Sequence, residues 1–363
     1  MKSLFLGVVS LLAALSLARP FLDVRKASLA AQGLPRLVIY YQTTHDSNGN
    51  PISMLPLVTE KNISLTHLIV CSFHINFNSE VHLNNFPPSD SRFYTLWNET
   101  EIMKAAGVKV MGMVGGAAAG SFNPQTLDGG NATFEHYYGQ LRDVISDFGL
   151  QGMDLDVEQS MSQAGIERLV DRLYADFGSD FIITLAPVAS ALRNGGNLSG
   201  FDYENLEADV GTAIDFYNAQ FYNGFGSMAS TTAFDAVISN GWNPEKIVVG
   251  QITSPDSGSQ FVPFATLNQT IIALRKEYGE IGGIMGWEYF NSQPGGTSEP
   301  WEWAEEMTKI LRPYSTVTLN VTAQTAAALE EAWTNSVISA DVKIAEEDLA
   351  VSAKVDYQAM VNA

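Results

Sequence analysis

The chain has 363 residues, a formal net charge of −20 and a single cysteine, Cys71. This negative charge argues against nucleic acid and membrane surfaces as partners, because both are anionic. One cysteine cannot form an intrachain disulfide, so stability must come from a large core. Cys71 lies in an apolar run, and we expect it to be a buried small hydrophobe.

The N-terminus has the pattern of an export signal. Lys2 supplies a positive charge, and an apolar run follows from Leu4 to Leu17. The run is too short to anchor the chain in a bilayer, so we expect a signal peptide over residues 1–18. The dibasic pair Arg25-Lys26 predicts the end of a short pro-segment, residues 19–26. The protein is therefore expected outside the cell.

Six Asn-x-Ser/Thr sequons support secretion, because such sites are glycosylated in the secretory pathway. They begin at Asn62, Asn98, Asn131, Asn197, Asn268 and Asn320.

Short apolar runs rich in β-branched residues recur along the chain, with amphipathic segments between several of them. This alternation predicts parallel strands joined by crossover helices. The runs are Leu37–Tyr41, Leu68–Phe73, Val108–Val114, Leu150–Glu158, Phe181–Ala186, Ile214–Tyr222, Ile247–Ile252 and Gly283–Tyr289. The clearest helical segments are Phe134–Phe148, Gly165–Phe177, Asn268–Tyr278 and Trp301–Leu311.

Eight such units predict a single (β/α)₈ TIM barrel over residues 27–312, without a large insertion domain. An open doubly wound sheet is the alternative, and it usually carries a Gly-rich phosphate-binding turn after its first strand. The chain has Tyr40-Tyr41-Gln42-Thr43-Thr44 there. Beyond Pro313 the composition shifts to Ala, Ser, Thr and Val. Residues 313–363 are either an extension removed during maturation or a docked terminal helix.

The run Leu150–Glu158 carries the most information about function. Alternate side chains of a strand point to the same face, so Asp154, Asp156 and Glu158 share a face, with neighbours about 6.5 to 7 Å apart. Mutual repulsion should raise the pKa of at least one of these carboxyls, as a general acid requires. Glu158 lies at the C-terminal end of the strand, where barrel active sites are found.

The acidic run has two other interpretations. An edge strand with solvated charges is one, but a closed barrel has no edge. A calcium loop is the other, but Gln159-Ser160 replaces the residues of an EF-hand at this point.

At these residues the chain resembles glycoside hydrolase family 18, whose fourth strand carries Asp-Gly-x-Asp-x-Asp-x-Glu. Met111–Gly116, Gln220–Asn223 and Gly286–Tyr289 match further segments in the family's order. The resemblance covers residues 36–312. Within the family, the motif residues of this chain are most similar to those of secreted fungal endo-β-N-acetylglucosaminidases. Gln151 replaces the first Asp of the signature. The resemblance implies that this position is the deepest of the acids and tunes Asp154.

The resemblance also implies the catalytic roles. Glu158 would protonate the leaving oxygen and later deprotonate water. Asp156 would hold the N–H of the substrate's acetamido group, whose oxygen acts as the nucleophile, and Asp154 would share a proton with Asp156. Tyr222 would donate its hydroxyl to the acetamido oxygen; packing in the barrel core is its alternative role.

The same resemblance suggests the substrate-binding residues. Trp287 would form the floor beneath the sugar in the −1 subsite, with core packing as its alternative role. Gln220 and Asn223 would line the pocket. Gly115 and Gly116 would let the backbone approach the ligand, or would simply turn the strand.

Other hydrolytic centres have no counterpart in the sequence. No two of the five histidines are spaced as His-x-x-x-His, and there is no Gly-x-Ser-x-Gly motif. We therefore expect neither a metal nor a cofactor.

Three functions remain open at this point. The first is an endo-β-N-acetylglucosaminidase that cuts the chitobiose core of N-glycans by a retaining, substrate-assisted mechanism. The second is an endochitinase with the same chemistry, and the third is a non-catalytic chito-oligosaccharide-binding protein, which the presence of Glu158 disfavours. We expect N-glycans of glycoproteins or chito-oligosaccharides as partners, and a monomeric protein.

Overall fold

The computed structural model describes residues 34–314, 321–328 and 331. The expected signal peptide and pro-segment, Asn320 and most of the extension from residue 313 lie outside the described residues. None of the helices in the described part of the chain has the length and apolar character needed to span a bilayer.

Eight parallel strands form a closed barrel, in which the first strand pairs with both the second and the last. This closure confirms the predicted TIM barrel and excludes the open doubly wound sheet. The barrel strands are β1 (Arg36–Tyr41), β2 (His67–His74), β4 (Lys109–Gly115), β5 (Gly152–Asp156), β6 (Ile182–Leu185), β7 (Phe216–Gln220), β8 (Ile247–Ile252) and β9 (Gly283–Trp287).

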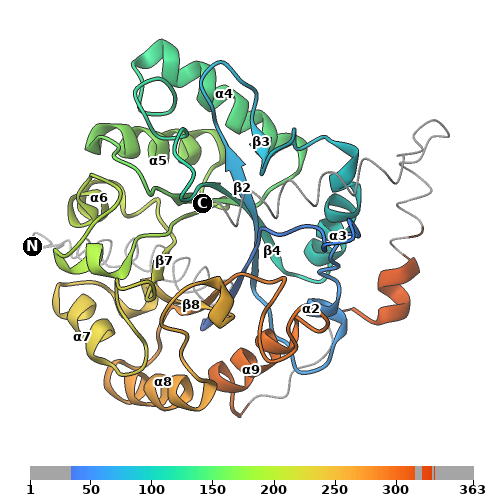
Figure 1. The fold of residues 1–363 in the computed structure, drawn as a ribbon. Coiled ribbons are helices and arrows are strands. Elements are labelled where there is room, and N and C mark those ends of the chain that lie inside the picture. Colours follow the sequence, from blue (N-terminus) through green and yellow to red (C-terminus); the bar gives the residue numbers. More distant parts are fainter. Residues whose placement is uncertain (1–33, 315–320, 329–330, 332–363) are drawn as a thin grey trace, which may run out of the picture. The chain divides into compact units, whose positions relative to one another are not determined.

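An α-helix follows each barrel strand before the next, or after the last, and the helices surround the strands (Figure 1). The four helices expected from the sequence are confirmed, with ends that differ by up to four residues. The helices are α2 (Pro56–Thr59), α3 (Tyr94–Ala105), α4 (Asn131–Asp147), α5 (Gln163–Phe177), α6 (Tyr203–Val210), α7 (Thr232–Ser239), α8 (Phe264–Tyr278) and α9 (Glu302–Leu311). Short 3₁₀ turns lie at Ser91–Phe93, Ala189–Arg193, Pro244–Lys246 and Pro255–Ser257.

One strand was not expected from the sequence. β3 (His82–Leu83) pairs antiparallel with the end of β2, so that His74 lies opposite His82. This hairpin extends β2 at its C-terminal end, above the barrel.

The barrel interior is filled by inward-facing side chains, including Val38, Ile69, Met111 and Met285. Towards the N-terminal ends of the strands, the Arg36 guanidinium lies 4.4 Å from the centre of the Phe216 ring. His67 contacts the same ring edge-on. Burial lowers the pKa of His67 to about 3, which keeps the imidazole neutral. This packing closes one end of the barrel, so the opposite end is available for a site.

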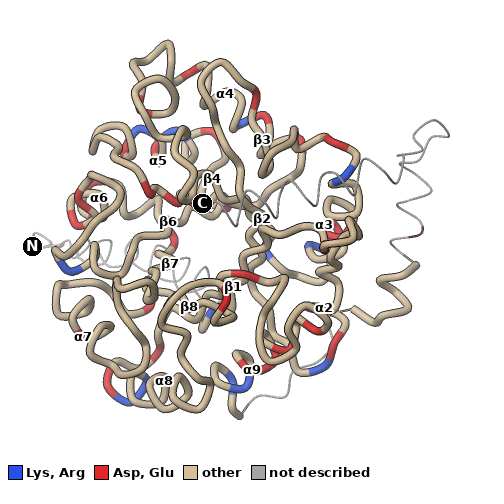
Figure 2. Tube along the Cα trace, in the orientation of Figure 1, with Lys and Arg blue, Asp and Glu red and all other residues tan. Residues whose placement is uncertain are grey.

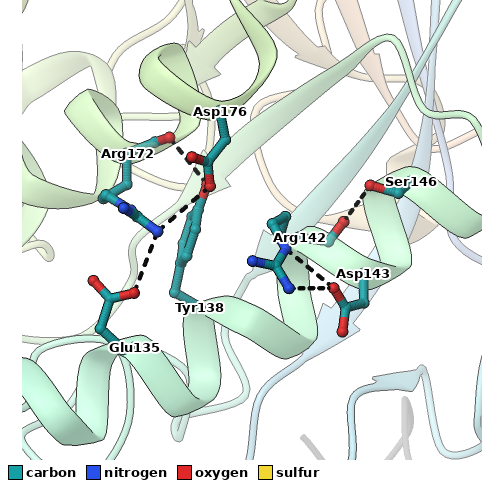
Figure 3. Close-up of polar contacts among 7 residues, drawn as sticks. All are labelled: Glu135, Tyr138, Arg142, Asp143, Ser146, Arg172 and Asp176. Atoms are coloured by element: carbon teal, nitrogen blue, oxygen red, sulfur yellow. Dashed lines mark hydrogen bonds and ion pairs between the residues drawn. The ribbon is translucent and has the colours of Figure 1, made fainter.

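Many of the charged residues lie on the surrounding helices and the loops that join them (Figure 2). Figure 3 shows one such cluster, where α4 meets α5: the Tyr138 hydroxyl oxygen lies 2.9 Å from Asp176 and 3.0 Å from the Arg172 carbonyl, two acceptors that share its one proton. The Arg172 guanidinium lies 3.2 Å from Glu135 and 3.5 Å from Asp176. These contacts fasten two neighbouring helices of the outer ring.

Part of the expected extension contacts the barrel's helices. Val321 and Ala326 are buried with Ile102 of α3, and the Val321 N–H donates to the Val58 carbonyl of α2 at 3.4 Å. This part of the extension is therefore docked.

Candidate active site

Three acids follow one another from the barrel interior to its rim. Asp154 is 0% exposed and Asp156 is 6% exposed, both on β5. Glu158 is half-buried and lies two residues beyond the end of the strand. We expected the strand to include Glu158, but β5 ends at Asp156. The Glu158 carboxyl therefore lies on the segment that follows the strand at the barrel rim, where a substrate can reach it. Met153 and Leu155 pack outward against the helices, as the alternation predicted.

Asp154 is held by side chains from three other strands. The Tyr40 hydroxyl donates to one carboxyl oxygen at 2.6 Å. Thr184 and Asn218 donate to the other oxygen at 2.5 Å and 3.1 Å. Burial raises the pKa of Asp154, and these three hydrogen bonds act in the opposite direction because they stabilise the carboxylate.

Asp156 has the stronger reason to hold a proton. Burial, followed by the charges of Glu158 and Asp154, raises the pKa of this carboxyl well above its usual range. The direction agrees with the expectation for the acidic row, but burial and not repulsion is the largest cause of the rise. Three hydrogen bonds oppose the rise at Asp154, so of the two buried carboxyls Asp156 is the one whose pKa is raised further.

Gln220, at the end of β7, connects the two upper acids. Its side-chain nitrogen lies 3.1 Å from Glu158 Oε1 and 3.4 Å from Asp156 Oδ1. The same nitrogen donates to the Ala186 carbonyl at 3.0 Å. One amide hydrogen is therefore directed to the Ala186 carbonyl, and the other lies between the two carboxyls, nearer to Glu158.

Two aromatic residues lie at the same end of the barrel. Tyr222 is 5% exposed; burial, followed by the charges of Asp156 and Glu158, raises the pKa of its hydroxyl, which stays protonated. Trp287 ends β9 half-buried, with its ring centre 5.6 Å from that of Tyr40. Since Tyr40 binds Asp154, this indole lies beside the acidic row.

Gly115 and Gly116 bring the end of β4 against β5. Both have positive φ, +106° and +86°, and a Cβ on Gly115 would collide with the backbone carbonyl of Asp156. The Gly116 N–H donates to that carbonyl at 2.9 Å. A Cβ on Gly116 would lie 3.8 Å from both Asp156 Oδ2 and Ser72 Oγ. Gly115 is thus required by the strand contact, and Gly116 borders the carboxyl of Asp156.

Asn223 contacts a neighbouring loop of the rim. It is exposed, adopts a left-handed conformation with φ of 53°, and accepts the Ser259 N–H at 2.8 Å. This bond joins the segment after β7 to the segment after β8. Asn223 thus connects two loops at the edge of the site.

Gln151 lies outside the acidic row, which corrects the expectation from the signature. Its side-chain oxygen accepts the Val110 N–H at 3.0 Å, and its own N–H donates to the Val110 carbonyl at 2.7 Å. Position 151 has the opposite parity to the acids in the strand alternation, so its side chain faces away from Asp154. The expectation that this position is the deepest acid and tunes Asp154 is wrong.

Sequence reasoning missed the three donors to Asp154, namely Tyr40, Thr184 and Asn218. Each lies within a predicted strand, at a position where the strand alternation points the side chain into the barrel. The same alternation is found for residues that only pack in the core, so it does not identify these three as donors. Among the residues that the structure describes, no group of three His, Cys, Asp or Glu side chains could hold a metal ion.

The described sequons differ in accessibility. Asn62, Asn131 and Asn197 are exposed, and Asn268 is half-buried on α8. Asn98 is only 8% exposed on α3, which leaves no room for a glycan on the folded surface.

Two solved structures of known proteins are similar to this barrel. A solved fungal endo-β-N-acetylglucosaminidase from glycosyl hydrolase family 18 is 67% identical, with a TM-score of 0.77, and the match covers 78% of this chain and 100% of that one. The chitinase ChiC from Aspergillus fumigatus is 46% identical, with a TM-score of 0.68, over 75% of this chain and 98% of that one.

Sequence relatives lead to the same family. Chitinase 1 of Rhizopus niveus is 26% identical over 288 residues, which is 72% of this chain and 56% of the relative. The chain thus spans little more than half the length of that relative. The family model described as glycosyl hydrolases family 18 matches residues 36–255. The chain therefore belongs to glycosyl hydrolase family 18.

Proposed function

We propose that the protein is an endo-β-N-acetylglucosaminidase that hydrolyses the β-1,4 bond in the N,N′-diacetylchitobiose core of N-glycans. The observation that carries the chemistry is the row Asp154, Asp156 and Glu158, in which burial and the neighbouring charges raise the pKa of the middle acid well above its usual range. A protonated, buried Asp156 is poorly suited to act as a covalent nucleophile. It is well placed to bind an acetamido group, so the substrate supplies the nucleophile itself.

In the first step, Glu158 protonates the leaving glycosidic oxygen. The acetamido oxygen of the −1 sugar attacks its own anomeric carbon, and the bond to the leaving sugar breaks. As positive charge develops on the acetamido group, the proton of Asp156 shifts towards Asp154 and leaves a carboxylate beside the oxazolinium N–H. The Tyr222 hydroxyl donates to the acetamido oxygen and orients it.

In the second step, the Glu158 carboxylate removes a proton from water. That water attacks the anomeric carbon from the face that the leaving group vacated, which retains the configuration. The ring opens to the free acetamido group, and Glu158 recovers its proton. Trp287 forms the apolar floor beneath the −1 sugar during both steps.

The choice of N-glycans is supported by the 67% identity to a solved fungal endo-β-N-acetylglucosaminidase that is covered over its full length. An endochitinase is the second candidate, favoured by the similarity to ChiC and Chitinase 1. A non-catalytic binding protein is disfavoured, because Glu158 is present and bonded to Gln220.

One experiment separates the candidates. The protein is incubated with a high-mannose glycoprotein and, in parallel, with chitin oligomers. We expect release of the glycan with one N-acetylglucosamine left on asparagine, and poor hydrolysis of the oligomers. Efficient chitin cleavage without glycan release would establish the endochitinase instead.

We also propose that the protein is a secreted monomer, processed at both ends. Removal of residues 1–26 would give a mature N-terminus at Ala27, and cleavage beyond the docked residues 321–328 would remove the tail. Among the described sequons, we propose glycosylation at Asn62, Asn131, Asn197 and Asn268. Intact mass of the deglycosylated secreted protein tests the trimming; a mass covering residues 19–363 contradicts it.

A further inference from the structure

A buried carboxyl follows the proposed floor residue. Glu288 comes directly after Trp287 and is 2% exposed. Within the described part of the chain, none of the ion pairs includes it. The titratable groups that face it are Tyr41 on β1 and Cys71 on β2, both of whose pKa values its charge raises. Burial raises the pKa of Glu288 itself to about 7.

The carboxyl binds the turn at the end of β1. Its Oε2 accepts the N–H groups of Thr43 at 2.8 Å and Gln42 at 3.3 Å. Its Oε1 lies 3.1 Å from the Thr43 hydroxyl. The side chain thus joins β9 to the rim segment of β1 across the seam where the barrel closes.

The main chain at this point is fixed from the opposite side. Thr253, just beyond β8, donates its N–H to the Trp287 carbonyl at 2.8 Å and its hydroxyl to the Glu288 carbonyl at 2.5 Å. The Ser292 hydroxyl donates to the same Glu288 carbonyl at 2.9 Å. The main chain of Trp287 is therefore held on one side by Thr253, which follows β8. On the other side it is held through the Glu288 side chain, which binds the turn after β1.

The turn of β1 continues the connection towards the acids. The Gln42 carbonyl accepts a hydrogen bond from the Asn84 side chain at 3.0 Å, and Asn84 accepts the Ser72 N–H at 3.2 Å. The Ser72 hydroxyl and Asp156 Oδ2 both lie 3.8 Å from the point that a Cβ on Gly116 would occupy. The contacts of Glu288 thus belong to a chain of hydrogen bonds along the rim.

All three contacts are accepted by Glu288 and favour its carboxylate, but burial outweighs them and raises the pKa of Glu288 to about 7. Below that pH the neutral acid keeps the same contacts: its carbonyl oxygen accepts both N–H groups, and its O–H donates to the Thr43 hydroxyl, which can accept as well as donate. A glutamine offers the same pattern, with a carbonyl towards the N–H groups and an amide N–H towards Thr43. The carboxylate would add a buried charge that faces Tyr41 and Cys71 and that none of the basic side chains in the described residues pairs with.

We propose that Glu288 is a positioning residue, which holds Trp287 beneath the −1 sugar as a neutral hydrogen-bonding acid. The inference rests on the proposed function in one respect, the assignment of Trp287 as the floor. It predicts that hydrogen bonding, and not charge, is what the site requires at position 288.

The test compares Glu288→Gln, Glu288→Ala and the matched control Glu99→Gln. Glu99 is another buried carboxyl that binds a rim segment, through Ser53 and the Met54 N–H, on α3. Steady-state kinetics use the high-mannose glycopeptide or the chito-oligosaccharide, whichever the wild type hydrolyses. Calorimetry measures the binding of N,N′-diacetylchitobiose to each protein independently of turnover.

At about pH 5, Glu288→Gln should retain kcat/KM and chitobiose affinity within about threefold. Glu288→Ala should lose about 10- to 100-fold in kcat/KM and bind chitobiose more weakly, because small misplacements of a binding group are costly. The ratio of the Glu288→Gln rate to the wild-type rate should rise as the pH passes through about 7. Glu99→Gln should show no such rise.

Two results would overturn the inference. One is an alanine variant with wild-type kinetics and binding. The other is a glutamine variant as impaired as the alanine variant at about pH 5, which would mean that the charge is needed. If the wild type hydrolyses neither substrate, the proposed function fails, and the chitobiose affinities of the two variants still decide the role of Glu288.

Discussion

The side-chain nitrogen of Gln220 lies 3.1 Å from Oε1 of Glu158. The Ala186 carbonyl, 3.0 Å from the same nitrogen, fixes which end of the amide faces the acids, because a carbonyl needs a donor. Glu158 Oε1 must then accept, and the transferable proton is placed on Oε2. Gln220 thereby selects the oxygen from which Glu158 can protonate a glycosidic bond.

Replacing Gln220 by methionine should reduce kcat by about 10- to 100-fold, because hydrogen bonds to charged groups contribute about 1.5 to 3 kcal/mol. Steady-state kinetics on the hydrolysed substrate measure this. Gln251→Met is the control: Gln251 is buried on the adjacent strand, and its side chain bonds the Gly250 carbonyl. An unchanged kcat in Gln220→Met would show that the amide does not orient the acid.

Glu158→Gln and Asp156→Asn should differ on a preformed sugar oxazoline. Glu158→Gln keeps its shape but cannot transfer a proton, so hydrolysis of the natural bond should fall by about 10² to 10⁴-fold. Asp156→Asn should also be severe on the natural bond, because the charge beside the oxazolinium is lost. The oxazoline no longer needs the nucleophilic step, so Asp156→Asn should still process it. Time courses of oxazoline consumption decide, and substrate assistance is wrong if the wild type and Asp156→Asn both leave the uncatalysed rate unchanged.

The stability of the protein should fall with rising pH because of Glu288. Its pKa rises from 4.5 in the unfolded chain to about 7 in the fold, so the folded state retains a proton that the unfolded state loses between these values. The contribution is fully present below pH 4.5 and is lost as the pH passes through about 7, a change of about 3 kcal/mol. Urea unfolding of Glu288→Gln and wild type at several pH values tests this. The variant should gain relative stability towards higher pH; a constant difference would contradict the raised pKa.

Tyr138→Phe should destabilise the fold without affecting the site. The change removes the hydroxyl that joins Asp176 and the Arg172 carbonyl between α4 and α5 (Figure 3). The expected loss is about 1 kcal/mol in the free energy of unfolding, since the groups left behind are near solvent. Denaturant unfolding measures the loss, with kcat/KM as the companion measurement. A large fall in kcat/KM at full stability would indicate a coupling between these helices and the acids.

The sequence by itself determined the barrel and the acidic row. Both follow from local periodicity: strand runs alternate with amphipathic helices, and three acids at every second position must share a face of β5. The same alternation placed Met153 and Leu155 on the helix side. The same alternation also shows that Gln151, at an odd position, faces away from the acids at even positions. The family signature alone does not reveal this, because it includes position 151 together with the acids.

Only the tertiary structure decided which groups meet these acids. Tyr40 reaches Asp154 across 114 residues of chain, and Gln220 reaches Glu158 across 62. Such contacts depend on the register between neighbouring strands and on barrel closure, which no local pattern encodes. The same holds for Glu288, whose partner Thr43 lies 245 residues away. In sequence it is one more acid after a tryptophan; in the closed barrel it is buried across the seam, where desolvation raises its pKa and the β1 turn supplies its hydrogen bonds.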